Sequence, residues 1–447
     1  MTSPSTALLT DQYELTMVRA ALGSGMAGRR SVFELFGRRL PSGRRYGVVA
    51  GVGRALDALE RFRFGDAEVE MLVSKKVVDD RTAQWLSTYR FSGDIRGYGE
   101  GDLYYPGSPL LTVEGTFAEA VILETLLLSV YNYDSAVASA ASRMTLMADG
   151  RPCIEMGSRR ANEYAAVAAA RAAYIAGFAA TSNLEAGRTY GVPTTGTAAH
   201  SFTLLHDTEE QAFVAQIAAL GEDTTLLVDT YDIEEAVRTG VRITEGRLGA
   251  VRIDSGDLVA TAKEVRALLD DLGATKTRII VTSDLDEWQI AALSGAPVNG
   301  YGVGTSVVTG SGAPTCSFVY KLVARASSDD ADAPMVPVAK KSAQKSTVGG
   351  RKYALRRRDA KGFAEAELVG IGAAPEGDGD DRQLLRDLVL GGEVVGREPL
   401  DAARERHAAG IHELPRDAFK MSRGEPCIPT YFLDETGHIA PNPYDRS

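Results

Sequence analysis

Beginning near residue 150, the sequence repeats one pattern: a short apolar run, a cluster of polar residues, and then a stretch with helical periodicity. The apolar runs are residues 153–156, 190–193, 226–228, 250–253, 279–281 and 298–301. We interpret each run as a buried strand because it is short, apolar and bounded by turn-forming residues. Strands that alternate with helices are parallel and joined by right-handed crossovers. The middle of the chain is therefore predicted to have an α/β fold.

Two α/β architectures satisfy this pattern, an open doubly wound sheet and a (β/α) barrel. In an open sheet, the functional residues concentrate at one switch point between strands. Here nearly every predicted strand ends in charged or small polar residues. Such a distribution is typical of a barrel, in which the loops at one face all contribute to one site. The pattern therefore favours a barrel.

The last predicted strand leads into Gly302, Val303, Gly304 and Thr305. Barrels frequently bind a phosphate in the loops after their last strands, where glycine lets backbone N–H groups approach the phosphate oxygens. A short glycine-containing loop is also common as a simple tight turn, so only its position strengthens the interpretation. We expect a phosphate-binding loop here.

The two ends of the chain differ from the middle. Residues 31–36 read as a strand, residues 40–43 as a turn, and residues 101–109 as a loop rich in Tyr, Pro and Gly. We predict an N-terminal α+β domain at 1–135, a (β/α) barrel-like catalytic domain at 136–325, and a C-terminal segment at 326–447. This last segment is expected to return in part to the N-terminal domain.

The charge balance restricts the possible partners. Sixty acidic residues against 49 basic ones give a net charge of −11, so broad attraction to nucleic acid or to an anionic membrane is not expected. Any anionic ligand needs a local site. Cys153, Cys316 and Cys427 are too far apart in sequence for a zinc motif, and no signal peptide is recognisable. These features predict a cytoplasmic protein.

His200 is the first candidate for chemistry, because it lies at a predicted strand end among Thr195, Thr197 and Ser201. An imidazole there can act as a general base, a metal ligand or a phosphoryl acceptor. The alternative is a structural histidine whose hydrogen bonds are satisfied by its neighbours. The residues alone leave both interpretations open.

Arg159 follows one predicted strand, and Arg252 lies near the end of another. Their guanidinium groups would therefore converge at the mouth of a barrel. Their geometry matches carboxylate or phosphate. The alternative is a structural ion pair with Glu155 or Asp254. Asp254 and Asp257 could bind ribose hydroxyls or a hydrated Mg²⁺, or could simply cap a helix.

Two further features favour structural interpretations. Residues 340–361 contain nine Lys and Arg residues and only Asp359 as an acid. We interpret this segment as a solvated hairpin with exposed charges, of which one or two could reach an anionic substrate. Tyr13 reads as a core residue of an amphipathic helix near its N-cap.

Taken together, eight segments resemble the nicotinate phosphoribosyltransferase family over nearly the whole chain. The matching segments are residues 10–17, 33–36 with 40–41, 156–160, 193–202, 228–232, 252–258, 302–305 and 318–322. The resemblance implies an incomplete (β/α) barrel of the type II phosphoribosyltransferase kind, with an α+β domain built from the N- and C-terminal parts. It also implies a homodimer whose active sites lie at the subunit interface.

The resemblance assigns a role to each of several residues. His200 resembles the histidine that ATP phosphorylates, and Tyr13 resembles an aromatic residue that stacks on the pyridine ring in the partner subunit's site. Arg159 resembles the arginine near nicotinate and the pyrophosphate. Arg252 and Asp254 resemble the catalytic pair that holds phosphoribosyl pyrophosphate and its ribose.

Four more residues are implied to bind substrate. Gly304 and Thr305 match the loop that holds the 5-phosphate. Thr197 and Ser201 belong to a segment whose hydroxyl donors suit the carboxylate of nicotinate. That carboxylate needs donors, and the segment contains no acid that could accept from an amide.

The expected reaction is ATP-coupled transfer of phosphoribosyl from phosphoribosyl pyrophosphate to nicotinate, giving nicotinate mononucleotide and pyrophosphate in NAD salvage. Mg²⁺ is the expected cofactor and ATP a co-substrate. Alternatives are nicotinamide or quinolinate as acceptor, a phosphate-binding barrel enzyme of another class, or a non-enzymatic sensor. Asn162 and Gly349 depart from the family pattern, so no role is assigned to their segments.

Overall fold

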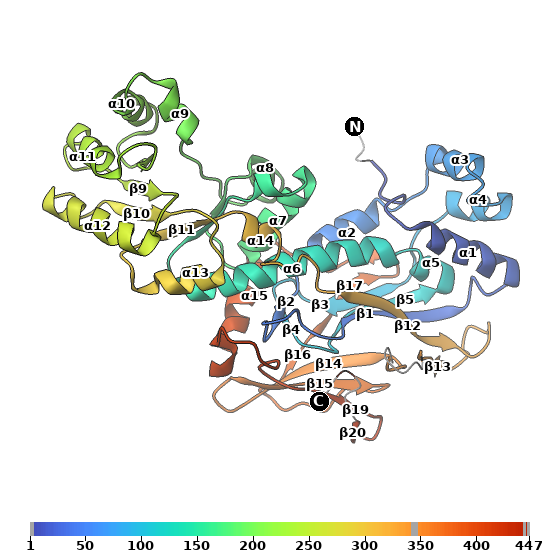
Figure 1. Ribbon diagram of the computed structural model, residues 1–447. Coiled ribbons are helices and arrows are strands. Elements are labelled where there is room, and N and C mark those ends of the chain that lie inside the picture. Colours follow the sequence, from blue (N-terminus) through green and yellow to red (C-terminus); the bar gives the residue numbers. More distant parts are fainter. Residues whose placement is uncertain (1–3, 341–346, 441–443, 445–447) are drawn as a thin grey trace. The chain divides into compact units, whose positions relative to one another are not determined.

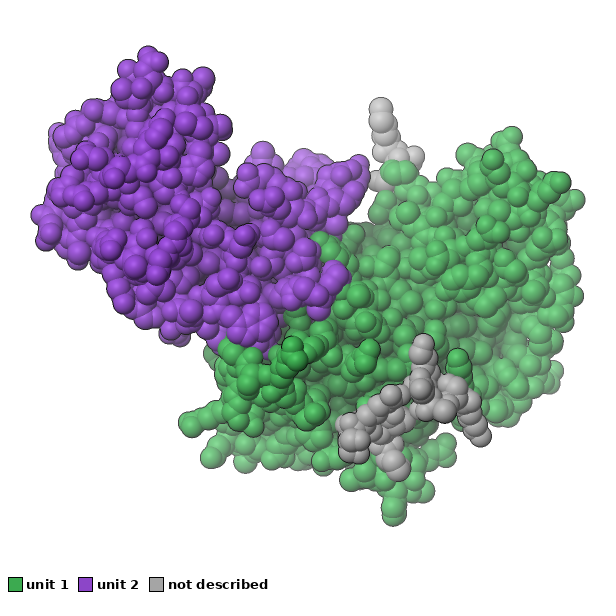
Figure 2. Space-filling model, in the orientation of Figure 1, with its two compact units in different colours: residues 1–136, 315–447 green, residues 137–314 purple. Residues whose placement is uncertain are grey.

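The computed structural model describes residues 4–340, 347–440 and 444. The chain divides into two compact units (Figure 2): unit 1 comprises residues 1–136 and 315–447, and unit 2 comprises residues 137–314. Within the described residues, no helix combines the length and apolar character needed to cross a membrane.

Unit 2 contains a six-stranded sheet in which every pair of neighbouring strands is parallel. In spatial order the strands are β7 (Ala180–Thr181), β6 (Cys153–Glu155), β11 (Gly300–Val303), β10 (Arg278–Val281), β9 (Ala250–Ile253) and β8 (Thr225–Leu227). Three of the four residues of β9 and all four of β11 are buried. Such nearly continuous burial is typical of a parallel strand covered on both faces.

The strand order is that of a barrel with one opening. β6, the first strand, pairs with β11, the last, and every other pair joins strands that are consecutive in the chain. Among the described residues, no strand pairing joins β7 to β8, so the ring is open there. The predicted incomplete (β/α) barrel is confirmed.

Helices connect these strands (Figure 1). They are α7 (Glu163–Ile175), α8 (Leu184–Tyr190), α9 (His200–Leu205), α10 (Glu209–Leu220), α11 (Ile233–Ile243), α12 (Leu258–Asp271), α13 (Glu287–Ala292) and α14 (Thr305–Val308), with short 3₁₀ turns η1 (Ser158–Arg160) and η2 (Leu293–Gly295). The side chains of Asp232, Asp257 and Asp286 accept from backbone N–H groups at the starts of α11, α12 and α13. The helix-cap interpretation of Asp257 is therefore confirmed.

One strand was predicted in the wrong place. Tyr190 is the last residue of α8, and residues 191–193 are not a strand. The actual second strand, β7, lies upstream, and Thr194 only forms an isolated bridge to Thr181. Because β7 has just two residues, it is too short to produce a periodic signal in the sequence. The last strand, β11, also begins two residues later than expected.

Unit 1 contains three sheets. The first has seven strands in the order β13 (Met335–Pro337), β12 (Phe318–Ala326), β1 (Arg30–Gly37), β5 (Pro109–Thr116), β3 (Asp94–Tyr98), β17 (Leu385–Leu390) and β18 (Glu393–Val394). The second has five, in the order β16 (Arg382–Gln383), β14 (Lys352–Arg358), β15 (Ala364–Ile371), β19 (Thr430–Leu433) and β20 (Ile439–Ala440), and the third pairs β2 (Gly47–Val48) with β4 (Leu103–Tyr104). Among the described residues of unit 1, only β15 and β19 pair in parallel.

The helices that contribute to the main core of unit 1 are α1 (Gln12–Ser24), α2 (Val52–Glu60), α3 (Asp66–Ser74), α4 (Asp80–Ser87), α5 (Phe117–Val121) and the first half of α6 (Glu124–Ala148). Unit 1 also contains α15 (Leu400–His412) and the 3₁₀ turn η3 (Arg416–Phe419). The core draws on both ends of the chain, including Leu35, Tyr98, Leu126, Tyr320 and Val389. The expected α+β domain from the N- and C-terminal parts is confirmed.

Residues 315–325 were expected to close the barrel-like domain, but they lie in unit 1. β12 pairs with β1 in an antiparallel ladder that runs from Ser31 to Gly37. This pairing brings the chain back to unit 1 before residue 326. An antiparallel partner more than 280 residues away in sequence leaves no local signal of where the domain ends.

The basic segment is largely structural. Lys341 and Lys345 lie outside the described residues. Lys352 and Arg356 are 2% and 0% exposed and form ion pairs with Glu34 and Glu367. The interpretation as an exposed hairpin is wrong for these two, because alternate side chains of β14 point into the unit rather than to solvent.

Candidate active site

A network of hydrogen bonds joins the carboxyl ends of β8, β9 and β10. Asp229 follows β8, and its side chain is 2% exposed. Its Oδ2 accepts from the backbone N–H of Asp254, at 2.9 Å, and from the hydroxyl of Ser255, at 2.7 Å. The hydroxyl of Thr282, which follows β10, donates to Oδ1 of Asp254. The network therefore holds three strand ends together and positions the Asp254 carboxylate.

His200 is the first residue of α9 and faces this network. Its Nδ1 lies 3.1 Å from the hydroxyl oxygen of Thr230. Its Nε2 lies 3.8 Å from Oδ1 of Asp229, a buried oxygen with no hydrogen-bond partner among the described residues. The His200 side chain is 42% exposed. The ring is therefore open to solvent on one side and faces a carboxylate that can stabilise positive charge on it.

Arg252 lies on β9 and is incompletely paired. Its guanidinium donates to the hydroxyl of Thr197, at 3.3 Å, and to the carbonyl of Ala198, at 3.1 Å, while its Nε has no partner among the described residues. Burial lowers the pKa of Arg252. The negative charges of Asp254 and Asp229 counteract this lowering, and the positive charge of Arg159 adds to it. An anionic ligand would stabilise the charged form of Arg252 and so offset the cost of its burial.

Arg159 lies in η1 and is exposed. In the described part of the chain it makes no ion pair, so the alternative pairing with Glu155 is not formed. Glu155 instead accepts from the backbone N–H of Gly157 and from the hydroxyl of Thr181. Arg159 and Arg252 are thus two guanidinium groups close enough to repel each other, as expected for a site that binds a polyanion.

The predicted phosphate loop lies close to the turn that carries Arg159. A Cβ on Gly157 would come within 2.8 Å of the carbonyl oxygen of Gly304 and within 2.2 Å of a methyl group of Val308. Only glycine allows this approach of the two backbones. Thr305, the first residue of α14, is exposed.

A cavity of about 290 Å³ opens at the ends of β9 and β10. Gly256, Asp257, Ser283 and Asp284 contribute to its lining. Ser283 has a φ of 135°, a conformation that costs energy in a residue with a side chain. Strained backbone of this kind clusters at functional sites, and the volume suits a small ligand.

Two predicted residues are not brought into this network. Ser201 lies in α9 and is exposed, without a hydrogen bond to the other predicted residues. Tyr13 lies on α1 of unit 1 and is 47% exposed. Partial burial and the nearby Glu124 raise the pKa of Tyr13 to about 12, so it is an uncharged aromatic at neutral pH.

Sequence reasoning missed the supporting residues of the site. Asp229 and Thr230 were recognised only as part of the matching segment 228–232, and Thr282 only as a polar residue after a predicted strand; none was given a role. The available signal was their position directly after apolar runs, but the sequence does not show which strand ends are neighbours. Asp229 and Asp254 meet because β8 and β9 pair in parallel.

The donors at the strand ends fit a hydrated Mg²⁺ better than a protein-enclosed metal. No cluster of three or more His, Cys, Asp or Glu side chains that could hold a metal ion occurs among the described residues. Mg²⁺ is usually held by one or two carboxylates together with water and substrate phosphates. Asp229 has a buried oxygen without a hydrogen-bond partner, and Asp254 is adjacent to it.

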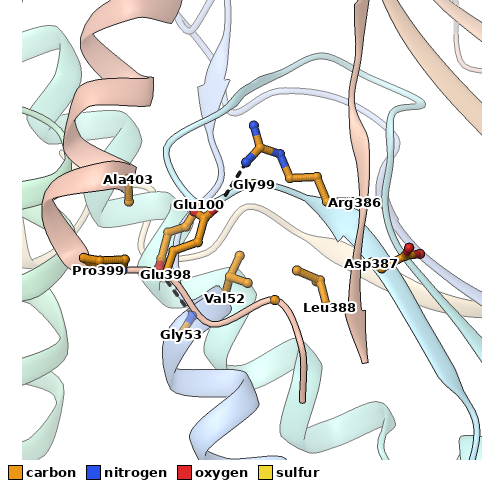
Figure 3. Close-up of a pocket in the computed structure, with 11 residues that line it drawn as sticks. Val52, Gly53, Gly99, Glu100, Arg386, Asp387, Leu388, Glu398, Pro399 and Ala403 are labelled. Carbon is orange, nitrogen blue, oxygen red and sulfur yellow. Dashed lines mark hydrogen bonds and ion pairs between the residues drawn. The ribbon is translucent and has the colours of Figure 1, made fainter. Parts of the chain in front are cut away.

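Unit 1 has cavities of a different kind. Figure 3 shows one of about 60 Å³, lined in part by Glu100, Arg386 and Glu398. Glu100 accepts from the backbone N–H groups of Gly51 and Gly53, and Glu398 pairs with Arg386. None of the predicted site residues lines it. Its polar groups are satisfied internally, so we do not assign it to the active site.

An incomplete parallel barrel whose strand ends carry carboxylates, a histidine and guanidinium groups without ion pairs among the described residues is typical of an α/β enzyme that acts on an anionic substrate. Two family models match the chain: the nicotinate phosphoribosyltransferase (NAPRTase) N-terminal domain at residues 8–132, and the nicotinate phosphoribosyltransferase (NAPRTase) family at residues 152–349. The chain belongs to the nicotinate phosphoribosyltransferase family.

Individual relatives agree. Nicotinate phosphoribosyltransferase pncB1 of Mycobacterium tuberculosis H37Rv is 56% identical over 95% of this chain and 94% of its own length. The pncB2 protein of the same strain is 39% identical over 92% of this chain and 88% of its own. The crystal structure of human nicotinic acid phosphoribosyltransferase matches with a TM-score of 0.81 and 26% identity, over 96% of this chain and 98% of that one.

Proposed function

We propose that this protein transfers phosphoribosyl from phosphoribosyl pyrophosphate to nicotinate, releasing pyrophosphate, with ATP hydrolysis coupled through His200. The observation that carries the proposal is the pair of guanidinium groups, Arg159 and Arg252, held near carboxylates at the ends of parallel strands. A diphosphate leaving group requires such concentrated positive charge. Membership of the family supplies the reaction type.

The transfer step needs electrostatic stabilisation more than proton transfer. The bond between the anomeric carbon and the diphosphate oxygen breaks, and the pyridine nitrogen supplies the electron pair for the new C–N bond. As diphosphate leaves, positive charge develops on the ribose and negative charge on the leaving group. The Asp254 carboxylate can stabilise the positive charge on the ribose, and Arg252 with Arg159 can stabilise the negative charge on the diphosphate. Mg²⁺, when bound, would neutralise further charge on the diphosphate.

The geometry around His200 suits a phosphoryl carrier. A neutral ring nitrogen attacks the terminal phosphorus of ATP, the bond to the ADP oxygen breaks, and ADP leaves. The positive charge that this creates on the ring is stabilised by the buried Asp229 oxygen 3.8 Å from Nε2. Hydrolysis of the P–N bond then returns His200 to its starting state. Asp229 is in this proposal a residue that orients and stabilises the ring.

Incubation with ATP labelled at the terminal phosphate tests the carrier. We expect label that is lost in acid and retained in base, and that is absent from His200→Ala, which retains slow ATP-independent transfer. Asp229→Asn should slow labelling about tenfold, because a neutral amide stabilises the charged ring less well. Label that persists in His200→Ala would show that another residue carries the phosphate.

The acceptor is tested by pyrophosphate release with nicotinate, nicotinamide and quinolinate. Hydroxyl and guanidinium donors pair with a carboxylate and leave an amide N–H without an acceptor, a loss of about 1–3 kcal/mol. We therefore expect kcat/KM for nicotinate to exceed that for nicotinamide at least tenfold. Equal values for the two would contradict the assignment of the pocket.

The proposal includes a homodimer with shared sites, in which Tyr13 stacks on the pyridine ring bound by the partner subunit. The exposed ring of Tyr13 on α1 is consistent with this role. It also includes action in a reducing, cytoplasmic environment. Cys153, Cys316 and Cys427 are all free thiols, and burial raises the pKa of the first to about 12.

A further inference from the structure

Glu155 is an unusual residue for the interior of unit 2. It is the last residue of β6 and is 0% exposed. Among the described residues it forms no ion pair, although burying an unpaired carboxylate is costly. Burial raises its pKa, and the hydroxyl of Thr181 and the backbone N–H of Gly157 counteract this. Its two oxygens are thus held by neutral donors rather than by a cation.

The hydrogen bonds of Glu155 form part of a closed ring. One carboxylate oxygen accepts from the N–H of Gly157 and the other from the hydroxyl of Thr181. The oxygen of Thr181 accepts from the N–H of Asn183 at 3.0 Å, and the Asn183 amide donates to the hydroxyl oxygen of Ser158 at 2.9 Å. The chain from Gly157 to Ser158 completes the ring. It therefore fixes both residues that immediately precede Arg159.

Arg159 depends on this support because its own side chain forms no ion pair in the described part of the chain. It is exposed, makes no ion pair among the described residues, and is repelled by Arg252. The turn lies close to both segments, since a Cβ on Gly157 would come within 2.9 Å of the Glu155 carboxylate and 2.8 Å of the Gly304 carbonyl. Loss of the ring would let the turn, and with it the guanidinium, move away from Arg252.

We propose that Glu155 is a positioning residue: its carboxylate holds the turn at residues 157–158 so that Arg159 and Arg252 face one diphosphate group. The inference rests on the proposed function, since it concerns the same phosphoribosyl pyrophosphate site. Binding the substrate then requires no movement of Arg159 against the repulsion of Arg252.

A double-mutant cycle tests whether Glu155 acts through Arg159. We expect Glu155→Ala and Arg159→Ala each to raise the KM for phosphoribosyl pyrophosphate at least tenfold, with kcat changed less. The double variant should resemble Arg159→Ala alone, because the second change removes nothing that still operates. Effects that multiply in the double variant would overturn the proposal. Glu155→Gln keeps the shape and one acceptor, and should recover most of the affinity.

Two threonine variants provide a matched comparison. Thr181 and Thr244 are both 0% exposed, but only Thr181 belongs to the ring, whereas Thr244 directly follows α11 and donates to carbonyls of that helix. Thr181→Val should raise the KM for phosphoribosyl pyrophosphate several-fold, and Thr244→Val should leave it unchanged at a similar loss of Tm. Equal KM values for the two would also overturn the proposal. If Glu155→Ala does not fold, the cycle is measured with Thr181→Val in its place.

Pyrophosphate binding, measured by calorimetry on the intact protein, separates this inference from the proposed function. Wild-type protein that neither binds pyrophosphate nor releases it from phosphoribosyl pyrophosphate would contradict the proposed function itself. Active wild-type protein with multiplicative effects in the cycle contradicts only the role of Glu155. Weaker pyrophosphate binding in Thr181→Val than in Thr244→Val supports that role independently of turnover.

Discussion

Two buried ion pairs of unit 1 and two arginines at the strand ends of unit 2 show opposite uses of charge. In unit 1, Lys352 with Glu34 and Arg356 with Glu367 form ion pairs whose side chains are at most 2% exposed. In unit 2, neither Arg159 nor Arg252 forms an ion pair among the described residues, and Arg252 donates only to a hydroxyl and a carbonyl. A buried charge with a counter-ion is already neutralised, whereas an arginine without a counter-ion at a strand end can take an anionic ligand.

The difference teaches how to separate structural from functional charge. Arg356 also lies over the ring of Tyr105 and donates to the carbonyl of Leu103, and Glu367 accepts from Tyr98 as well, so each member of this ion pair has further partners. A substitution there should affect folding, whereas a substitution at Arg252 should affect binding and catalysis. The following predictions test that separation, in decreasing order of expected effect.

Arg356→Ala should have the largest effect, and on stability. Removing the cation leaves Glu367 buried without its counter-ion, which costs about 3–5 kcal/mol in free energy of unfolding. Urea denaturation measures this. Arg397→Ala serves as the control, because Arg397 pairs with Asp57 and Glu60 at the surface with half its side chain exposed, and should cost less than about 1 kcal/mol. Equal losses would show that burial of the pair does not matter.

Arg252→Ala should show the opposite result, a large loss of activity with little loss of stability. Its loss removes charge that stabilises the leaving diphosphate, so kcat/KM should fall about 10²–10³-fold. The free energy of unfolding should change by less than about 1 kcal/mol, because only two hydrogen bonds of moderate length are lost. Steady-state kinetics measure kcat/KM, and urea denaturation of the same preparation measures the free energy of unfolding. A stability loss comparable to that of Arg356→Ala would show that Arg252, like Arg356, serves mainly to stabilise the fold.

Glu14 is an exception within unit 1, a buried carboxylate held by hydroxyl and amide donors of Thr10 and Thr125 rather than by a cation. Burial raises its pKa to about 7. A raised pKa means that its stabilising contribution is complete below its ordinary pKa of about 4.5 and is lost as the pH rises through 7. The stability of the wild type relative to Glu14→Gln should therefore fall by about 2 kcal/mol between pH 5 and pH 8. A difference that is constant with pH would show that Glu14 does not titrate in this range.

Tyr13→Ala should have the smallest effect. Stacking contributes about 0.5–1.5 kcal/mol beyond burial, so the KM for nicotinate should rise roughly two- to tenfold. Labelling of His200 by ATP should be unchanged. This variant is the one substitution in unit 1 that is expected to alter substrate binding without loss of stability.

Mixing chains tests whether that effect acts across subunits. A dimer of Tyr13→Ala with Arg252→Ala contains one site with neither defect, if one chain supplies Tyr13 and the other Arg252. Activity should therefore reappear after subunit exchange, measured by pyrophosphate release. No recovery in mixed dimers verified by native mass spectrometry would rule out a shared site.

Much of the barrel could be predicted because its signals are local. Residues 250–253 were identified as a strand with the bounds of β9, and Asp257 as the cap of the helix that follows. Apolar runs report burial, and a cap residue bonds within its own turn. β7 escaped detection because two residues carry no periodicity, and β11 was placed two residues early because its flanking residues are also apolar.

The candidate site could be predicted only in part. His200, Arg159 and Arg252 were selected because charged and polar residues follow strands, and the family resemblance assigned their roles. Asp229 was not selected, since its importance lies in an unbonded oxygen 3.8 Å from His200. Such a distance depends on which strands are neighbours and not on spacing along the chain.

By itself, the sequence determined the α/β alternation, most strands of the barrel, a candidate cap of α12, the net charge, and the family. These properties follow from the order of apolar and polar residues within short windows, and from motifs that can be matched directly. The tertiary structure decided the closure of β6 on β11, the return of β12 to β1, and the difference between Arg356, which is paired with a buried carboxylate, and Arg252, which forms no ion pair among the described residues. Whether a charge is neutralised depends on residues that approach from distant parts of the chain, because Coulomb interactions and desolvation act through space.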